Sequence, residues 1–155
     1  QLLRLHKNVF PEFWKWQEQI IANALLSMEM QTVMGWKMYV PPRTNLRDRN
    51  KERTLANFPM QANGADMLRI AVINASEMGV RLLAPIHDAL LIESTVEGID
   101  YAVKRTQEAM ADASVTVLDG FRLSTDVEIV RWPDRYTDER GSEMWSKIMK
   151  LLPKA

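Results

Sequence analysis

Apolar positions recur at helical spacing near the start of the chain. In residues 11–29, PEFWKWQEQIIANALLSME, they fall at i, i+3, i+4 and i+7, the rhythm of an amphipathic helix. Pro11 suits the first turn of such a helix, where a missing N–H has no partner to lose. Residues 30–40 alternate between apolar and polar instead and contain Gly35. We therefore predict a long helix followed by a short hairpin.

A second helical pattern begins at residue 49, but Pro59 interrupts it. Proline lacks the backbone N–H and its ring collides with the preceding turn, so we expect the helix to break or kink there. Asn57 would then cap a separate helix over residues 59–78. Gly79 is the expected end of that helix, because glycine adopts the left-handed conformation that follows a helix end.

The stretch LLAPIHDALLIE, residues 82–93, places two apolar runs of strand type around a His-Asp pair. We predict strands at 81–86 and 89–93 with a tight turn at His87 and Asp88. A strand pair holds a side chain at its turn rigidly, and a carboxylate there suits Mg²⁺, which prefers oxygen ligands. Aspartate is also common in ordinary turns, so the dipeptide alone does not distinguish the two interpretations.

The remaining patterns complete an α+β fold. Thr95 is positioned to cap a helix over residues 96–114, residues 122–130 alternate like a third strand, and residues 139–152 have a helical pattern. An antiparallel β-hairpin plus a third strand, packed with long helices, indicates α+β rather than a doubly wound parallel sheet.

Composition narrows the class of protein. The 155 residues suffice for one domain with a core, and no run of about eighteen apolar residues or secretory signal is present. The absence of cysteine excludes disulfides and thiolate metal sites and fits a reducing compartment, so we expect a cytoplasmic protein with no membrane partner. The chain begins with Gln1 inside a helical pattern, which predicts a fragment of a longer protein.

The formal net charge is zero, so no global field attracts the chain to DNA. Residues 43–53, RTNLRDRNKER, nevertheless carry five basic and two acidic side chains, a local charge of +3. Such runs are usually solvated linkers, and the alternative is a strip that contacts phosphates.

Three polar side chains share one face if the helix continues past residue 57. Arg53, Asn57 and Gln61 lie at i, i+4 and i+8 and can donate to phosphates and to base edges in the minor groove. Taken singly, each also has an ordinary explanation, as an ion-pair member, a helix cap and an exposed helix residue.

Taken in order along the chain, these residues resemble the motifs of a known family. The pattern R-x3-N-x-P-x-Q-x3-A-D, followed by apolar-H-D-x-apolar-apolar-apolar-E, resembles the C-terminal end of family A DNA polymerases of the bacterial repair and phage replicative type. The matching positions are Arg53, Asn57, Pro59, Gln61, Ala65, Asp66, Ile86, His87, Asp88, Leu90, Leu91, Ile92 and Glu93.

The resemblance implies a role for five of these polar residues. Asp88 would bind catalytic Mg²⁺, and His87 would sit near the primer 3′ end. Arg53, Asn57 and Gln61 would contact primer-template DNA near the terminal base pair, largely in the minor groove. The reaction would be two-metal nucleotidyl transfer from a dNTP, in DNA replication or repair.

The same resemblance divides the chain into three parts. Residues 1–46 would be the end of the fingers, residues 47–133 the distal palm with the metal-site hairpin, and residues 134–155 a C-terminal helical tail. The family's other metal-binding Asp and its nucleotide-gripping helix lie upstream. The upstream part of the same polymerase is therefore an expected partner, and we expect the fragment alone to be inactive.

The sequence departs from the family at the hairpin. Ala89 stands where the family usually has Glu, and Pro85 where it usually has a polar residue. These departures keep two alternatives open. One is a nucleic-acid-binding module that has lost catalysis. The other is a structural α+β domain that uses a Met- and Trp-rich surface for protein contacts.

Overall fold

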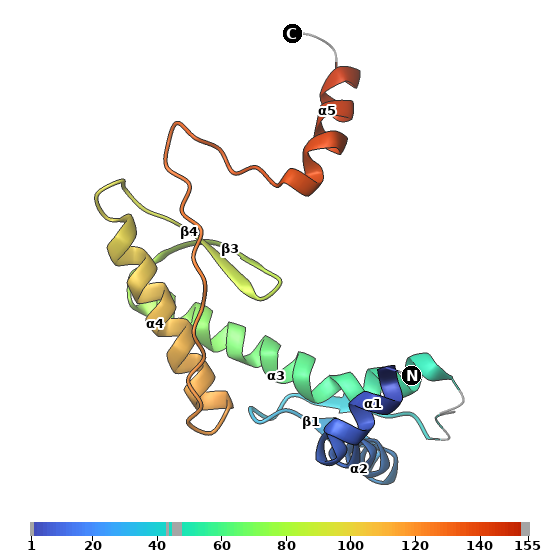
Figure 1. Cartoon of the computed structure of the whole chain (residues 1–155). Helices are drawn as coiled ribbons and strands as arrows, with labels where there is room; N and C mark the ends of the chain where they lie inside the picture. Colours follow the sequence, from blue (N-terminus) through green and yellow to red (C-terminus); the bar gives the residue numbers. More distant parts are fainter. Residues whose placement is uncertain (1, 43, 45–47, 153–155) are drawn as a thin grey trace. The chain divides into compact units, whose positions relative to one another are not determined.

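The computed structural model describes residues 2–42, 44 and 48–152 (Figure 1). Its contacts divide the chain into two compact units, residues 1–125 and residues 126–155. The helices and strands of the first unit are α1 (Leu2–Val9), α2 (Pro11–Ser27), β1 (Glu29–Gln31), β2 (Lys37–Tyr39), α3 (Arg49–Glu77), β3 (Arg81–Ile86), β4 (Ala89–Glu93) and α4 (Ile99–Val117). The second unit contains the short 3₁₀ helix η1 (Glu139–Gly141) and α5 (Ser142–Leu151). The predicted α+β class is confirmed.

The first helix and hairpin form as predicted. Pro11 opens α2, and Met28 ends it in the left-handed region with φ 57°. β1 and β2 pair antiparallel, and Gly35 in the connecting turn has φ +89°, a conformation that favours glycine. The prediction of a long helix followed by a short hairpin is confirmed.

Of the break or kink predicted at Pro59, the break is wrong, because α3 runs without interruption from Arg49 to Glu77. Asp48 caps it by accepting a hydrogen bond from the Asn50 N–H at 3.0 Å, so Asn57 is not a cap. Proline removes one hydrogen bond, but Leu55 and Phe58 on either side of the affected turn are buried in a core. Packing thus outweighs the local cost of the proline.

The end of α3 is as predicted. Gly79 has φ +76°, its N–H donates to Ser76 O at 2.9 Å, and the Val80 N–H donates to Ala75 O at 3.0 Å. This pair of bonds is a Schellman motif, which satisfies helix carbonyls and turns the chain into β3.

Two separate cores pack against α3. The proximal core joins α2 and the β1–β2 hairpin to the N-terminal half of α3, and the distal core joins β3, β4 and α4 to its C-terminal end. The buried residues of the proximal core are Ile21, Ala24, Met30, Val40, Leu55, Phe58 and Ala62. Those of the distal core are Ala75, Val80 and Ala109, with Met78, Leu82 and Ile92 against them.

The β3–β4 hairpin has the predicted bounds. Its strands are antiparallel, with Ile86 opposite Ala89 and Arg81 opposite Glu93, and a bulge lies between Leu82 and Ala84. The predicted start of the following helix is wrong. The Thr95 hydroxyl accepts a hydrogen bond from the Gly98 N–H at 3.2 Å, which closes a turn, and α4 begins only at Ile99.

The predicted third strand is also wrong, since residues 122–130, all of them described, form no strand ladder. Side chains of α4 bind the backbone here instead. The buried Ser114 hydroxyl accepts from the Leu123 N–H at 2.9 Å, and Gln107 donates to Thr125 O at 2.9 Å. Backbone groups engaged in this way are not available to a neighbouring strand.

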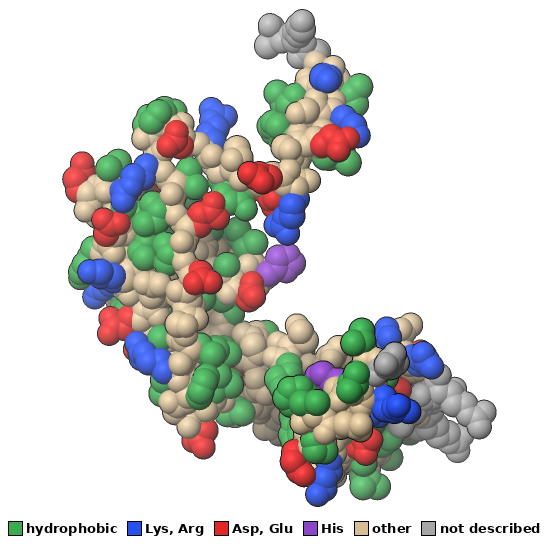
Figure 2. Space-filling view, in the orientation of Figure 1, with side chains coloured by type: hydrophobic (Ala, Val, Ile, Leu, Met, Phe, Trp, Pro, Cys, Tyr) green, Lys and Arg blue, Asp and Glu red, His purple; other side chains and the backbone are tan. Residues whose placement is uncertain are grey.

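Hydrophobic side chains remain exposed on both units. Figure 2 shows them gathered over α1 and the start of α2, and also along α5. Exposed examples are Leu2, Leu5, Phe10, Phe13, Trp16, Met144, Trp145 and Leu151. No helix of the described part of the chain is long and apolar enough to span a membrane.

Candidate functional site

The three polar residues singled out on α3 do share one face. Because the helix is continuous, each four-residue step from Arg53 to Asn57 to Gln61 rotates by about 40°, and the three span about 12 Å along the axis. All three side chains are exposed. None forms a hydrogen bond or ion pair with another described residue, so their donors are open to a ligand.

The helix phase decides which way this face points. Asn57 and Ala75 are 18 residues apart, about five turns, so they lie on the same side of α3. Ala75 packs in the distal core with Val80 and Ala109. The face that carries Arg53, Asn57 and Gln61 is therefore on the side of α3 where β3, β4 and α4 pack. The proximal core uses the opposite side, since Ala62 is rotated by about 220° from Ala75.

His87 and Asp88 form the exposed two-residue turn of the β3–β4 hairpin. His87 has φ +55°. A positive φ at the first residue of such a turn is usually supplied by glycine, so a histidine here is a locally strained position of the kind found at functional sites. Asp88 is neither buried nor bonded to a described side chain, and both of its oxygens can reach a ligand.

The β3–β4 hairpin extends back from the C-terminal end of α3. The six residues of β3 span about 20 Å, and Gln61 precedes Ala75 by about 21 Å of helix. In the view of Figure 1 the turn of the hairpin points from the C-terminal end of α3 toward its N-terminal half. The turn that carries Asp88 therefore points toward the half of α3 that contains Gln61.

Asp88 is the acidic residue of the turn itself. Glu93 lies at the other end of β4, where it forms an ion pair with Arg81 at 2.7 Å. Among the described residues, no group of three or more His, Cys, Asp or Glu side chains could hold a metal ion. The described part of the chain therefore offers one carboxylate to a metal at this turn, and the position beside it is Ala89.

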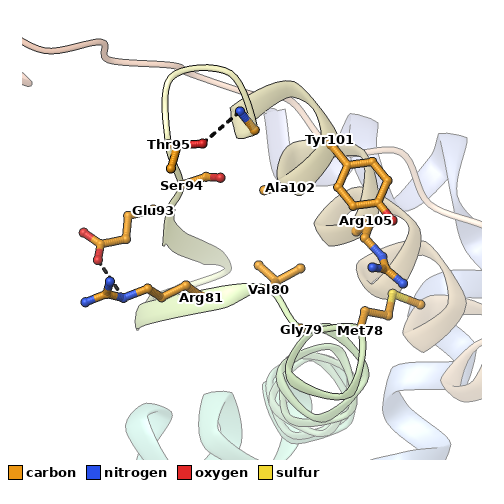
Figure 3. A pocket seen from close by; sticks show the side chains of 11 residues that line it. Met78, Gly79, Val80, Arg81, Glu93, Ser94, Thr95, Tyr101, Ala102 and Arg105 are labelled. Carbon is orange, nitrogen blue, oxygen red and sulfur yellow. Dashed lines mark hydrogen bonds and ion pairs between the residues drawn. The ribbon is translucent and has the colours of Figure 1, made fainter.

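A pocket of about 560 Å³ lies at the base of the hairpin, away from Asp88 (Figure 3). Arg81 and Glu93 pair at one side of it, and the Arg105 guanidinium lies over the Tyr101 ring at 5.1 Å on the other. Neither Asp88 nor the α3 face of Arg53, Asn57 and Gln61 lines it, so the pocket is not a part of the site.

Two residues of α3 were not given a role by the sequence. Asn63 accepts a hydrogen bond from the Val33 N–H at 2.9 Å, and nothing in its spacing indicated this contact. Asp66 is 2% exposed and accepts from Arg69 at 2.7 Å. The i,i+3 spacing of opposite charges was the available signal for that pair.

Comparison with known proteins identifies the family. The family model of DNA polymerase family A matches residues 1–131. The chain is similar to the thermostable DNA polymerase I of Thermus caldophilus, with 30% identity over 112 residues, which is 67% of this chain and 13% of that protein. It is 28% identical over 128 residues to the thermostable enzyme of Thermus aquaticus, covering 77% of this chain and 14% of that one.

A solved structure agrees in fold. The POL domain of Pol1 from M. smegmatis, in complex with DNA primer-template and dNTP, superposes with a TM-score of 0.60 and 26% identity. The match covers 70% of this chain and 21% of that structure. The chain thus spans only a small part of the length of the relatives it matches.

Proposed function

Because the chain belongs to DNA polymerase family A, we propose that it forms the end of the fingers and the distal palm of a DNA-directed DNA polymerase. The parent protein would extend a primer on a DNA template with dNTPs as substrates. The observation that most supports this proposal is the exposed face of Arg53, Asn57 and Gln61. This face lies on the side of α3 that packs against the hairpin bearing Asp88.

The α3 face suits contact with paired bases. The minor groove shows similar acceptors on every base pair, so the guanidinium of Arg53 and the amides of Asn57 and Gln61 would sense pair geometry without reading sequence. A mispaired terminus displaces these acceptors and loses hydrogen bonds. The same groups can also bind the backbone phosphates that fix the register of the duplex.

The hairpin turn suits a metal ligand. Mg²⁺ takes one or two protein carboxylates and completes its shell with water and phosphate oxygens, so a single exposed Asp88 fits one ligand position. When bound, the metal would activate the primer 3′-hydroxyl and balance charge on the phosphates. His87, next to Asp88, would lie near the primer 3′ end. The remaining ligands would come from the preceding part of the polymerase, and the fragment alone would not incorporate nucleotides.

Ala89 favours one further possibility. The family usually has a second carboxylate at this position, and its absence is the feature expected of a nucleic-acid-binding module that has lost catalysis. Such a parent would bind duplex DNA with an affinity that falls with salt and with Arg53→Ala, yet would extend no primer.

Primer extension by the full-length parent tests the proposal. We expect Asp88→Ala to lower the extension rate by about 10³-fold or more while duplex binding persists. Glu97→Ala, which removes another exposed carboxylate near the hairpin, is the matched control and should extend normally. Undiminished extension by Asp88→Ala would refute the role of Asp88. Salt-sensitive DNA binding with no extension by the wild-type parent would favour the lapsed module.

A further inference from the structure

We propose that Asn63 is a positioning residue, which ties the β1–β2 turn to the Pro59 turn of α3 and so fixes how Asn57 and Gln61 are presented together. This inference rests on the proposed function of the α3 face. It concerns a residue that touches neither DNA nor metal and acts through two others.

Asn63 binds two segments with one amide. Its Oδ1 accepts from the Val33 N–H at 2.9 Å, and its Nδ2 donates to the Pro59 carbonyl at 2.7 Å. This orientation of the amide satisfies both partners, because oxygen can only accept and nitrogen can only donate. One end of the link is thus in the turn between two strands, and the other is on the proline.

The turn that receives this link is well ordered by its own bonds. Thr32 is 4% exposed, its N–H donates to Trp36 O at 2.9 Å, and its hydroxyl accepts from the Trp36 N–H at 3.0 Å. The Trp36 ring stacks on Phe58, with centroids 5.8 Å apart and planes 18° from parallel. The turn therefore holds the same stretch of α3 at two points, Phe58 and Asn63.

That stretch is the mechanically weak part of the helix. Pro59 cannot donate to the Leu55 carbonyl, and a proline inside a helix is where the axis bends most readily. Asn57 precedes Pro59 and Gln61 follows it, so any change in bend alters the spacing and angle between the two amides. The contacts from Val33 and Trp36 resist such a change, since they attach both sides of the proline to one rigid turn.

The predicted consequence is loss of selectivity rather than loss of chemistry. If Asn57 and Gln61 jointly test the terminal base pair, a looser relation between them lets mispaired ends retain their contacts. Small misplacements in a preorganised site have large kinetic effects, so a change of about tenfold in selectivity is a reasonable scale.

The test uses the full-length parent polymerase and measures kcat/KM for extension from mismatched and from matched primer ends. We expect Asn63→Ala to raise the mismatched-to-matched ratio about tenfold, with kcat on matched ends changed much less. The hydrogen exchange of the Val33 amide, measured in the same protein, should become faster. Trp36→Ala, which changes an exposed ring, should shift the ratio in the same direction.

Two further variants separate positioning from general destabilisation. Asn63→Asp keeps an acceptor for the Val33 N–H but has no N–H to donate to the Pro59 carbonyl, so Val33 should stay protected while the ratio rises by less than in Asn63→Ala. Asn74→Ala, in the distal half of the same helix, should leave the ratio unchanged.

An unchanged ratio in Asn63→Ala, with faster Val33 exchange, would overturn the inference and leave the polymerase proposal standing. So would a wild-type ratio in Asn63→Asp, because that variant has lost the bond to the Pro59 carbonyl. If the wild-type parent extends no primer at all, the proposed function fails and this inference fails with it.

Discussion

The carboxylate of Asp66 accepts a hydrogen bond from the Arg69 guanidinium at 2.7 Å although the two side chains differ greatly in exposure, 2% against 61%. The second oxygen of Asp66 is buried and forms no hydrogen bond to any described residue. The helix therefore carries a buried anion that depends on one largely exposed cation. Removing that cation leaves the charge without a partner, which is costly in a low-dielectric interior.

We predict that Arg69→Ala lowers the free energy of unfolding by about 1–3 kcal/mol, because it strips the buried carboxylate of its hydrogen-bond donor. Adding Asp66→Asn should recover most of this loss by removing the charge. Thermal and urea unfolding of the two single variants and the double variant give the coupling between the sites. Strictly additive effects would show that the pair does not interact energetically.

Replacing glycine by alanine at two positions, one inside α3 and one just after it, should change the stability in opposite directions. Gly79 has φ +76°, where an L side chain is strained, so Gly79→Ala should destabilise by about 1 kcal/mol. Gly64 lies inside α3, and a Cβ there would meet no atom within 4 Å beyond the adjacent backbone of its own helix, so Gly64→Ala should stabilise by up to about 1 kcal/mol. Unfolding midpoints of the two variants measure the contrast, and a shared sign would contradict it.

Relieving the backbone strain at His87 should change stability and activity in opposite directions. His87→Gly should raise the free energy of unfolding by about 1 kcal/mol, because glycine adopts the observed φ without penalty. The same change removes the imidazole, so primer extension by the parent should fall. His87→Ala is the matched control, since it also lacks the imidazole but retains the strained backbone. A stability gain in both variants would point to the imidazole rather than the backbone as the source of strain.

Position 89 offers a gain-of-function test. Ala89→Glu adds an exposed carboxylate next to Asp88, at the first residue of β4, so the parent should need less Mg²⁺ for half-maximal extension. A Mg²⁺ titration of the extension rate measures the shift, with Ala89→Gln as the uncharged control. An equal shift in both variants would indicate an effect of side-chain size rather than charge.

The β1–β2 hairpin should show a pH-dependent contribution to stability. Lys37 donates to both oxygens of Glu29, at 2.9 and 3.1 Å, and this hydrogen bond, followed by the charge attraction, raises the pKa of Lys37. A raised pKa means that the stabilisation is present below the unfolded-state value of about 10.4 and is lost as pH rises through the folded-state pKa. The difference in unfolding temperature between the wild type and Lys37→Met should therefore persist at pH 7–9 and vanish at still higher pH. Because both groups are exposed, added salt should reduce the difference at neutral pH.

The sequence predicted the elements whose signals are local. The β3–β4 hairpin was placed to the residue because two apolar runs flank a short polar pair, and Gly79 marked a helix end through its backbone freedom alone. The face of Arg53, Asn57 and Gln61 also followed from spacing, and the continuous helix preserves it.

The errors arose where tertiary contacts decide. Pro59 should break an isolated helix, but the proximal core and the link from Asn63 hold this one together. Residues 122–130 alternate like a strand, yet Ser114 and Gln107 take up backbone groups of that segment. The roles of Asn63 and Asp66 depend on neighbours that spacing along the chain does not reveal.

The proximal and distal cores pack on opposite sides of α3. The number of residues between Ala62 and Ala75 therefore sets the rotation angle between the two contact surfaces as well as the distance between them. One inserted or deleted residue in this span would turn one contact surface by about 100° relative to the other. Homologues should therefore vary in length in the loops before and after α3 but keep its internal count. Any homologue that has gained a residue inside this span should have lost another nearby.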